Sequence, residues 1–203
     1  YDGAAGRADV LEHAAAGGSV AVLRRLAQPP FSLADGFDLL SGGRVLEVAV
    51  ITNHVEFLDA LVRPPWYSGG LMADVRGLLG RAVGDGALMA LERLLEPPFC
   101  AWTGREPHDR PGLSWLLELA VEGGGAKVLD RLACAPFCAT AKDARCSTAL
   151  ERAVLCGRIS AIDRLGAPPY SLTADEPRQW VAALYTSCSA QLLAALVRIT
   201  GAG

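Results

Sequence analysis

A string of two prolines followed by an aromatic residue recurs along this chain of 203 residues and constrains its fold more than any other feature. The aromatic residues are 35, 33, 38 and 33 positions apart. A period of this length is typical of proteins built from stacked supersecondary units. The string stands at Pro29-Pro30-Phe31, Pro64-Pro65-Trp66, Pro97-Pro98-Phe99 and Pro168-Pro169-Tyr170, with the variant Ala135-Pro136-Phe137.

Each string closes a block of one fixed length. The blocks begin at Leu11, Leu46, Leu79, Leu117 and Leu150, and each reaches its aromatic residue 20 positions later without a gap. A degraded sixth copy begins near 181 and has no proline pair. We therefore predict a single domain over residues 1–203 that contains about six repeats, joined by loops of varied length.

Apolar residues inside a block keep helical spacing. Positions 0, +3 and +4, counted from the first leucine, form the stripe of one short helix, and +12 and +15 belong to a second. The prolines should stop the second helix, and we expect the aromatic residue to fold back as a plug between neighbouring helices. Position +7 holds residues that tolerate a left-handed backbone and should end the first helix: Gly18, Asn53, Gly86, Gly124 and Gly157.

The fold expected from this pattern is all-α. Each unit would be a helix, a tight turn, a second helix and a proline stop. Because no unit can bury its apolar face alone, the units should stack into an elongated solenoid. The predicted core is the set of residues at positions 0, +3, +4, +12 and +15 of every block.

The blocks resemble ankyrin repeats, whose pattern is Thr-Pro-Leu-His-x-Ala-Ala-x-x-Gly-His followed by a second helix ending in Leu-Leu. The segments that carry the resemblance are Ser147 to Gly157 and Leu46 to Leu58. Glutamate usually replaces the family's histidine, and the Pro-Pro-aromatic string replaces its Gly-Ala. The resemblance covers roughly residues 8 to 200, and it implies a concave groove and fingertips that bind other proteins.

Composition excludes several other classes of function. The net charge is −3, and acidic and basic residues are mixed along the chain, so we expect no nucleic-acid partner. Mean hydropathy is +0.27, yet no apolar run is long enough for a membrane span. Six cysteines in a chain of this length are too few for a secreted disulfide scaffold, which favours reduced thiols in an intracellular compartment, either the cytoplasm or an organelle.

Catalytic and metal-binding patterns are weak, so we predict no enzyme activity, no cofactor and no metal site. His13 and His54 stand at repeat positions that favour a structural role. Cys134 and Cys138 flank the proline stop and have no histidine close in sequence. Glutamates recur at position +1, which we interpret as lying near a helix start, where they favour the helix dipole: Glu12, Glu47, Glu118 and Glu151.

Two places are candidates for partner binding. One is a predicted loop from Cys100 to Leu116, whose tryptophans and arginines have the composition of an interface hot spot, although both tryptophans could instead tuck against the stack. Its candidate residues are Trp102, Arg105, His108, Arg110 and Trp115. The other is the groove that the ankyrin resemblance implies, formed by positions +5 and +6, with Ile51, Thr52, Asp85, Glu122 and Leu155 as candidates.

From Gln179 to Gly203 the only charged side chain is Arg198. A free solenoid end needs polar cover, so we expect this end to be docked or to be followed by further repeats. Two hypotheses follow. The first is a non-enzymatic protein-interaction module or adaptor, and the second is a permanent structural subunit of a large multiprotein assembly, with an organelle as a fitting location.

Overall fold

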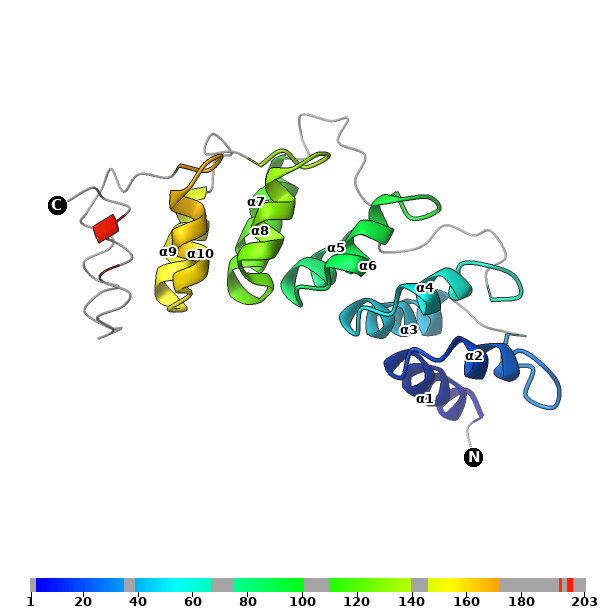
Figure 1. Ribbon diagram of the computed structural model, residues 1–203. Coiled ribbons are helices and arrows are strands. Elements are labelled where there is room, and N and C mark those ends of the chain that lie inside the picture. Colours follow the sequence, from blue (N-terminus) through cyan, green and yellow to red (C-terminus); the bar gives the residue numbers. More distant parts are fainter. Residues whose placement is uncertain are drawn as a thin grey trace. The chain divides into compact units, whose positions relative to one another are not determined.

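The computed structural model describes residues 3–34, 39–66, 75–100, 110–139 and 146–171, together with positions 194, 197 and 198. These residues form helices and turns and contain no strand (Figure 1). The predicted all-α class is confirmed for this part of the chain. None of its helices is long and apolar enough to cross a membrane.

Five of the blocks contain two helices each, as predicted. The first helices are α1 (Gly3–Ala16), α3 (Leu39–Ile51), α5 (Val75–Gly84), α7 (Arg110–Leu119) and α9 (Cys146–Leu155). The second helices are α2 (Val20–Leu26), α4 (Val55–Leu61), α6 (Leu88–Leu95), α8 (Gly125–Ala133) and α10 (Ile159–Gly166). A π-helical turn, η2 (Ala120–Gly124), follows α7. The sixth copy near 181 lies outside the described residues apart from three isolated positions.

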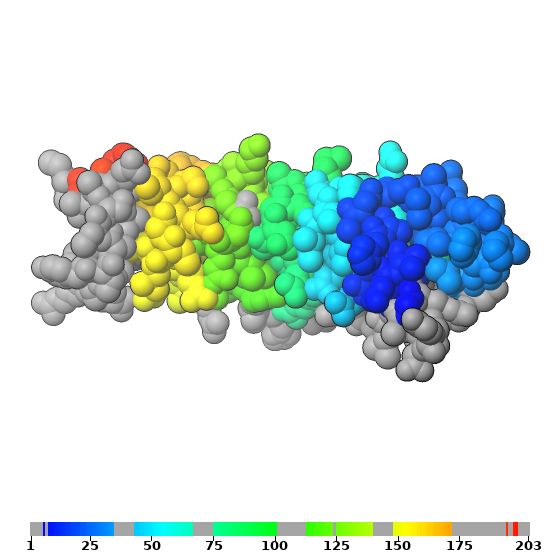
Figure 2. Space-filling model, turned by 90° about the horizontal axis from the view of Figure 1, so that it is seen from below, coloured from blue at the N-terminus to red at the C-terminus, as the bar shows by residue number. Residues whose placement is uncertain are grey.

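The chain divides into two compact units. The first unit comprises Tyr1–Ala82 and Ala87–Trp102, and the second comprises Val83–Gly86 and Thr103–Gly203. In the first unit α1 packs against α3, and the dark-blue atoms of α1 lie beside cyan atoms of the next block in Figure 2. The helix α2 packs against α4. In the second unit α7 packs against α9 and α8 against α10. Within each unit, a helix therefore contacts its counterpart in the next block, and the single repeat domain over 1–203 stays a prediction.

The predicted core is confirmed at every position but one. The residues at 0, +3, +4, +12 and +15 of the five blocks are buried, except Leu46, which is half-buried. Its neighbour Val45 is fully buried. Burial of a leucine contributes about 1.5–3 kcal/mol, so this repeated stripe accounts for much of the driving force for folding.

The turns between paired helices need a left-handed residue, as expected. Gly18, Asn53, Gly86 and Gly157 have φ values of 62°, 60°, 70° and 64°. The expectation for Gly124 was wrong, because the residue with positive φ in that block is Gly125, at 71°. The π-helical turn η2 holds one more residue per turn than an α-helix, so the left-handed residue comes one position later.

The first helices begin well before the predicted block starts. In the fourth block, residues 110 to 116 were expected to belong to a loop and instead lie in α7. Pro111 fits the first turn of a helix, where its missing N–H costs nothing. Leu113, Leu116, Leu117 and Ala120 then follow at helical spacing, and all four are buried.

The early helix starts also correct the interpretation of the recurring glutamates. All four lie past the middle of their helices: Glu12, Glu47, Glu118 and Glu151. The predicted favourable interaction with the positive, N-terminal end of the helix dipole is therefore wrong. In the first unit two of them pair with arginines of the next block. Glu12 lies 3.0 Å from Arg44, and Glu47 lies 2.6 Å from Arg81.

The same short structure follows each second helix: a cis proline bond and then an aromatic residue. The peptide bonds Pro29–Pro30, Pro64–Pro65, Pro97–Pro98, Ala135–Pro136 and Pro168–Pro169 are cis. The aromatic residue that follows is buried in four blocks, as Trp66, Phe99, Phe137 and Tyr170, which confirms the predicted plug there. In the first block the prediction was wrong, since Phe31 is 48% exposed.

Candidate partner-binding surfaces

The groove candidates lie at the ends of the first helices or in the turns after them. Ile51 and Leu155 are the last residues of α3 and α9, and they are 41% and 54% exposed. Asp85 is exposed. Thr52 is half-buried, and its hydroxyl donates a hydrogen bond to the carbonyl of Val48 at 2.8 Å. The side chains at Ile51, Asp85 and Leu155 are thus accessible, whereas Thr52 is turned back onto its own helix.

Glu122 is already engaged within the second unit. Its carboxylate accepts a hydrogen bond from Nε of Arg152, and its carbonyl accepts one from Nη2 of Arg158 at 2.7 Å. The hydrogen bond and the charge of Glu122 raise the pKa of the Arg152 guanidinium above its ordinary value. The structure therefore joins Glu122 to the next block, and a partner would have to displace Arg152 to reach this carboxylate.

Part of the predicted 100–116 loop lies outside the described residues. Trp102, Arg105 and His108 lie outside the described residues, and so does the side chain of Arg110 at the start of α7. Trp115 lies on α7 and is 37% exposed, although its neighbours Ser114 and Leu116 are buried. The Trp115 side chain is therefore partly covered by its own unit and partly accessible, and both alternatives stay predictions.

The two histidines considered as catalytic residues contact backbone carbonyls. A ring nitrogen of His13 is 2.7 Å from the carbonyl of Asp9, and Nε2 of His54 is 3.2 Å from that of Ala16. The second contact ties the start of α4 to the preceding block. Within the described ranges, no three acidic, cysteine or histidine side chains are grouped as metal ligands would be.

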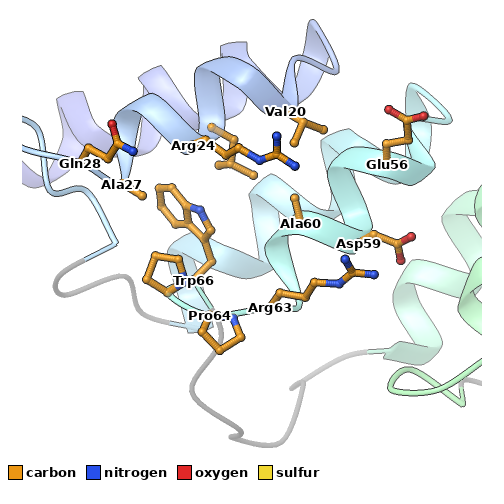
Figure 3. Close-up of a pocket in the computed structure, with 12 residues that line it drawn as sticks. Val20, Arg24, Ala27, Gln28, Glu56, Asp59, Ala60, Arg63, Pro64 and Trp66 are labelled. Atoms are coloured by element: carbon orange, nitrogen blue, oxygen red, sulfur yellow. The ribbon is translucent and has the colours of Figure 1, made fainter.

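A pocket that the repeat pattern did not predict lies between α2 and α4 in the first unit. Its volume is about 560 Å³. Figure 3 shows that one wall comes from α2 and the other from α4 and the proline string that follows it. The lining residues are Val20, Leu23, Arg24, Ala27, Gln28, Glu56, Asp59, Ala60, Arg63, Pro64, Pro65 and Trp66.

Four of the five blocks have an arginine at the repeat position that borders this pocket in the second block. At position +14 they have Arg25, Arg93, Arg131 and Arg164, each with its guanidinium carbon 5.1 to 5.7 Å from the centre of its own block's aromatic ring. Each guanidinium also donates a hydrogen bond to a carbonyl of the proline string. The four distances lie between 2.6 and 2.8 Å.

The second block has Ala60 at this position, next to the ring of Trp66. An alanine side chain reaches neither the ring nor the carbonyl of Pro64, so the space that the arginine fills elsewhere is left open. The departure from the repeat at +14 is visible in the sequence. This departure could have located the site from the sequence only if the role of the arginine had been known.

Comparison of the chain with protein-family models, with curated proteins and with solved structures finds no match.

Proposed function

We propose that this chain is a non-enzymatic protein-interaction module, or adaptor, made of ankyrin-like repeats that form a solenoid. The paired helices, the left-handed turn residue and the packing of like helices within each unit support the ankyrin-like part of the proposal. The free, exposed thiols of Cys100, Cys134, Cys138 and Cys156 fit an intracellular compartment, in the cytoplasm or an organelle.

The observation that carries the binding function is the exposure of large apolar side chains at one repeat position. Position +5 holds Ile51 in the second block and Leu155 in the fifth, and both side chains are exposed although the apolar stripes of the same helices are buried except at Leu46. Apolar side chains presented from rigid helix ends, together with Trp115, offer the kind of anchor that protein interfaces use.

The solenoid is tested by small-angle X-ray scattering of the whole chain. A compact globule of this length has a radius of gyration of about 17 Å. Stacked repeats make an elongated particle, so we expect a value clearly above that of the globule and a distance distribution with a long tail. A radius of gyration at the globular value would contradict the solenoid.

The binding function is tested by cross-linked affinity purification from native extract, read by mass spectrometry. We expect Ile51→Asp and Leu155→Asp to reduce captured partners without loss of helix content, because a carboxylate does not fit an apolar interface. Ser160→Asp, at an exposed position of α10, is the matched control and should capture partners as the unchanged chain does. Equal capture by all three variants would exclude position +5 as the binding surface.

A permanent structural subunit is the second candidate. Val10, Val22 and Phe31 in the first block are all exposed, and a fixed neighbour would cover such an apolar set. A constant, stoichiometric set of partners in the same purification would favour this candidate. Substoichiometric partners that cross-link near position +5 would favour the adaptor.

A further inference from the structure

We propose that the pocket between α2 and α4 binds an acidic segment of a partner protein, which inserts an apolar side chain beside Trp66 and places a carboxylate on Arg24. This proposal rests on the interaction function proposed above and names the site and the chemistry of the segment that it recognises.

The junctions between later blocks show what normally occupies this place. Nε of Arg93 donates to Oδ1 of Asp59 in the preceding block at 2.5 Å, while its guanidinium lies over Phe99. Nε of Arg164 likewise donates to Asp130 of the preceding block and lies over Tyr170. A carboxylate at +13, an arginine at +14 of the next block and an aromatic ring together fill these two junctions.

Both charged members are changed at the junction between the first and second blocks. Position +14 is Ala60, and position +13 of the preceding block is Arg24, where the two junctions just described have Asp59 and Asp130. Relative to the later junctions, α4 has lost an arginine and α2 has gained one. The result is an open site of about 560 Å³, within the size range of pockets that hold ligand groups.

The charges that remain available in the pocket favour an anion. Among the residues that the structure describes, neither the Arg24 nor the Arg63 guanidinium has a hydrogen-bond or ion-pair partner. The carboxylate of Asp59 is held by Arg93. Glu56 lies at the end of the pocket away from Trp66 (Figure 3). A carboxylate would therefore find two arginines, and the bond it forms with either would be charge-assisted.

The inner wall of the pocket is apolar and explains why the proposed segment inserts an apolar side chain. Leu23 is fully buried and Trp66 is almost so, and both line the cavity together with the small side chains of Ala27 and Ala60. Figure 3 shows the indole of Trp66 directed toward α2, between Gln28 and Arg24. A phenyl or branched aliphatic side chain fits beside this ring with an acidic neighbour on Arg24.

A partner's arginine could also stack on Trp66, but the local charges oppose it. In the two junctions described above the guanidinium is held by a carboxylate of the preceding block, and here that position is itself an arginine, Arg24. Two cations at this separation repel each other, so the cationic occupant is an alternative outcome of the experiment and not our proposal.

The test selects binders of the whole chain from a random-peptide phage library, with Ala60→Arg as the counter-selection. That variant restores the residue found in the other four blocks, so it should fold normally and fill the pocket. We expect selected peptides in which an aromatic or branched aliphatic residue adjoins aspartate or glutamate. Failure to enrich any sequence over the counter-selection, or enrichment of basic sequences, would overturn the proposal.

A fluorescein-labelled copy of the most enriched peptide then gives affinities by anisotropy. Ala60→Arg and Arg24→Asp should each weaken binding by about tenfold or more, as expected when a charge-assisted contact or its space is lost. Ala21→Arg adds the same side chain to an exposed position of α2 outside the pocket and should leave the affinity unchanged. Equal weakening by Ala21→Arg would mean that the effect is not local to the pocket.

The two proposals can fail separately. Partners that are captured from extract equally by the unchanged chain and by Ala60→Arg, with no peptide selected, would overturn the pocket and leave the interaction module in place. Peptides selected as expected, with no partner captured from extract, would leave the pocket and overturn the adaptor.

Discussion

The hydroxyl of Tyr170 donates a hydrogen bond to the backbone carbonyl of Leu129, 2.7 Å away and buried. Tyr170 follows α10 in the fifth block and Leu129 lies in α8 of the fourth, so the bond crosses a junction between blocks of the second unit. The aromatic residue that ends one block is thus fixed on the second helix of the block before it. This relationship explains why Phe31, with no earlier block among the described residues, is exposed.

Replacing Tyr170 with phenylalanine tests the contribution of this bond. Phe99 and Phe137 show that the site accepts a phenyl ring, so Tyr170→Phe should lose the hydrogen bond and little else. We expect the free energy of unfolding in urea to fall by about 0.5–1.5 kcal/mol. Phe31→Tyr, which adds a hydroxyl at the exposed equivalent, should change it by less than about 0.5 kcal/mol. Equal effects from both variants would contradict the buried bond.

Leu129 also tests the register of the core. Leu129→Ala removes a fully buried side chain at position +12 and should lower the free energy of unfolding by roughly 2–5 kcal/mol, because the surrounding helices cannot close the cavity. Leu155→Ala makes the same change at an exposed position and should have a small effect. Urea titration followed by circular dichroism measures both, and a neutral Leu129→Ala would mean that the register is wrong.

Asn53 has two roles that substitutions can separate. Its backbone is left-handed, with φ of 60°, and its Oδ1 accepts a hydrogen bond from the backbone N–H of Ala90 at 2.9 Å. Asn53→Gly keeps the backbone conformation and loses the bond, whereas Asn53→Ala loses both. We expect the alanine variant to be less stable than the glycine variant by about 1 kcal/mol in thermal or urea unfolding. The reverse order would show that the left-handed backbone is not required.

The unusual junction in the first unit can be converted to the common one. Arg24→Asp with Ala60→Arg completes the carboxylate, arginine and aromatic ring seen at the later junctions. In a double-mutant cycle of unfolding free energies, we expect a favourable coupling of about 0.5–1 kcal/mol, because the ion pair forms only when both residues are changed. A coupling of zero would indicate that Ala60→Arg does not place its guanidinium near α2.

The sequence by itself determined the block length, the two helices of each block and nearly all of the core. These features depend on spacing along the chain, because helical periodicity puts positions 0, +3 and +4 on one face whatever the neighbouring block contains. The left-handed turn residues were predictable for the same local reason, except in the fourth block, where the π-helical turn moves the position from Gly124 to Gly125.

The tertiary structure alone decided the features that depend on which residues of different blocks come into contact. Tyr170 is buried against the second helix of the block before it, whereas Phe31 is exposed and has no earlier block among the described residues. Two of the glutamates at +1, Glu12 and Glu47, pair with arginines of the next block, and the pocket exists because Arg24 and Ala60 face each other across α2 and α4. Contacts of this kind join residues more than thirty positions apart, so no local pattern encodes them.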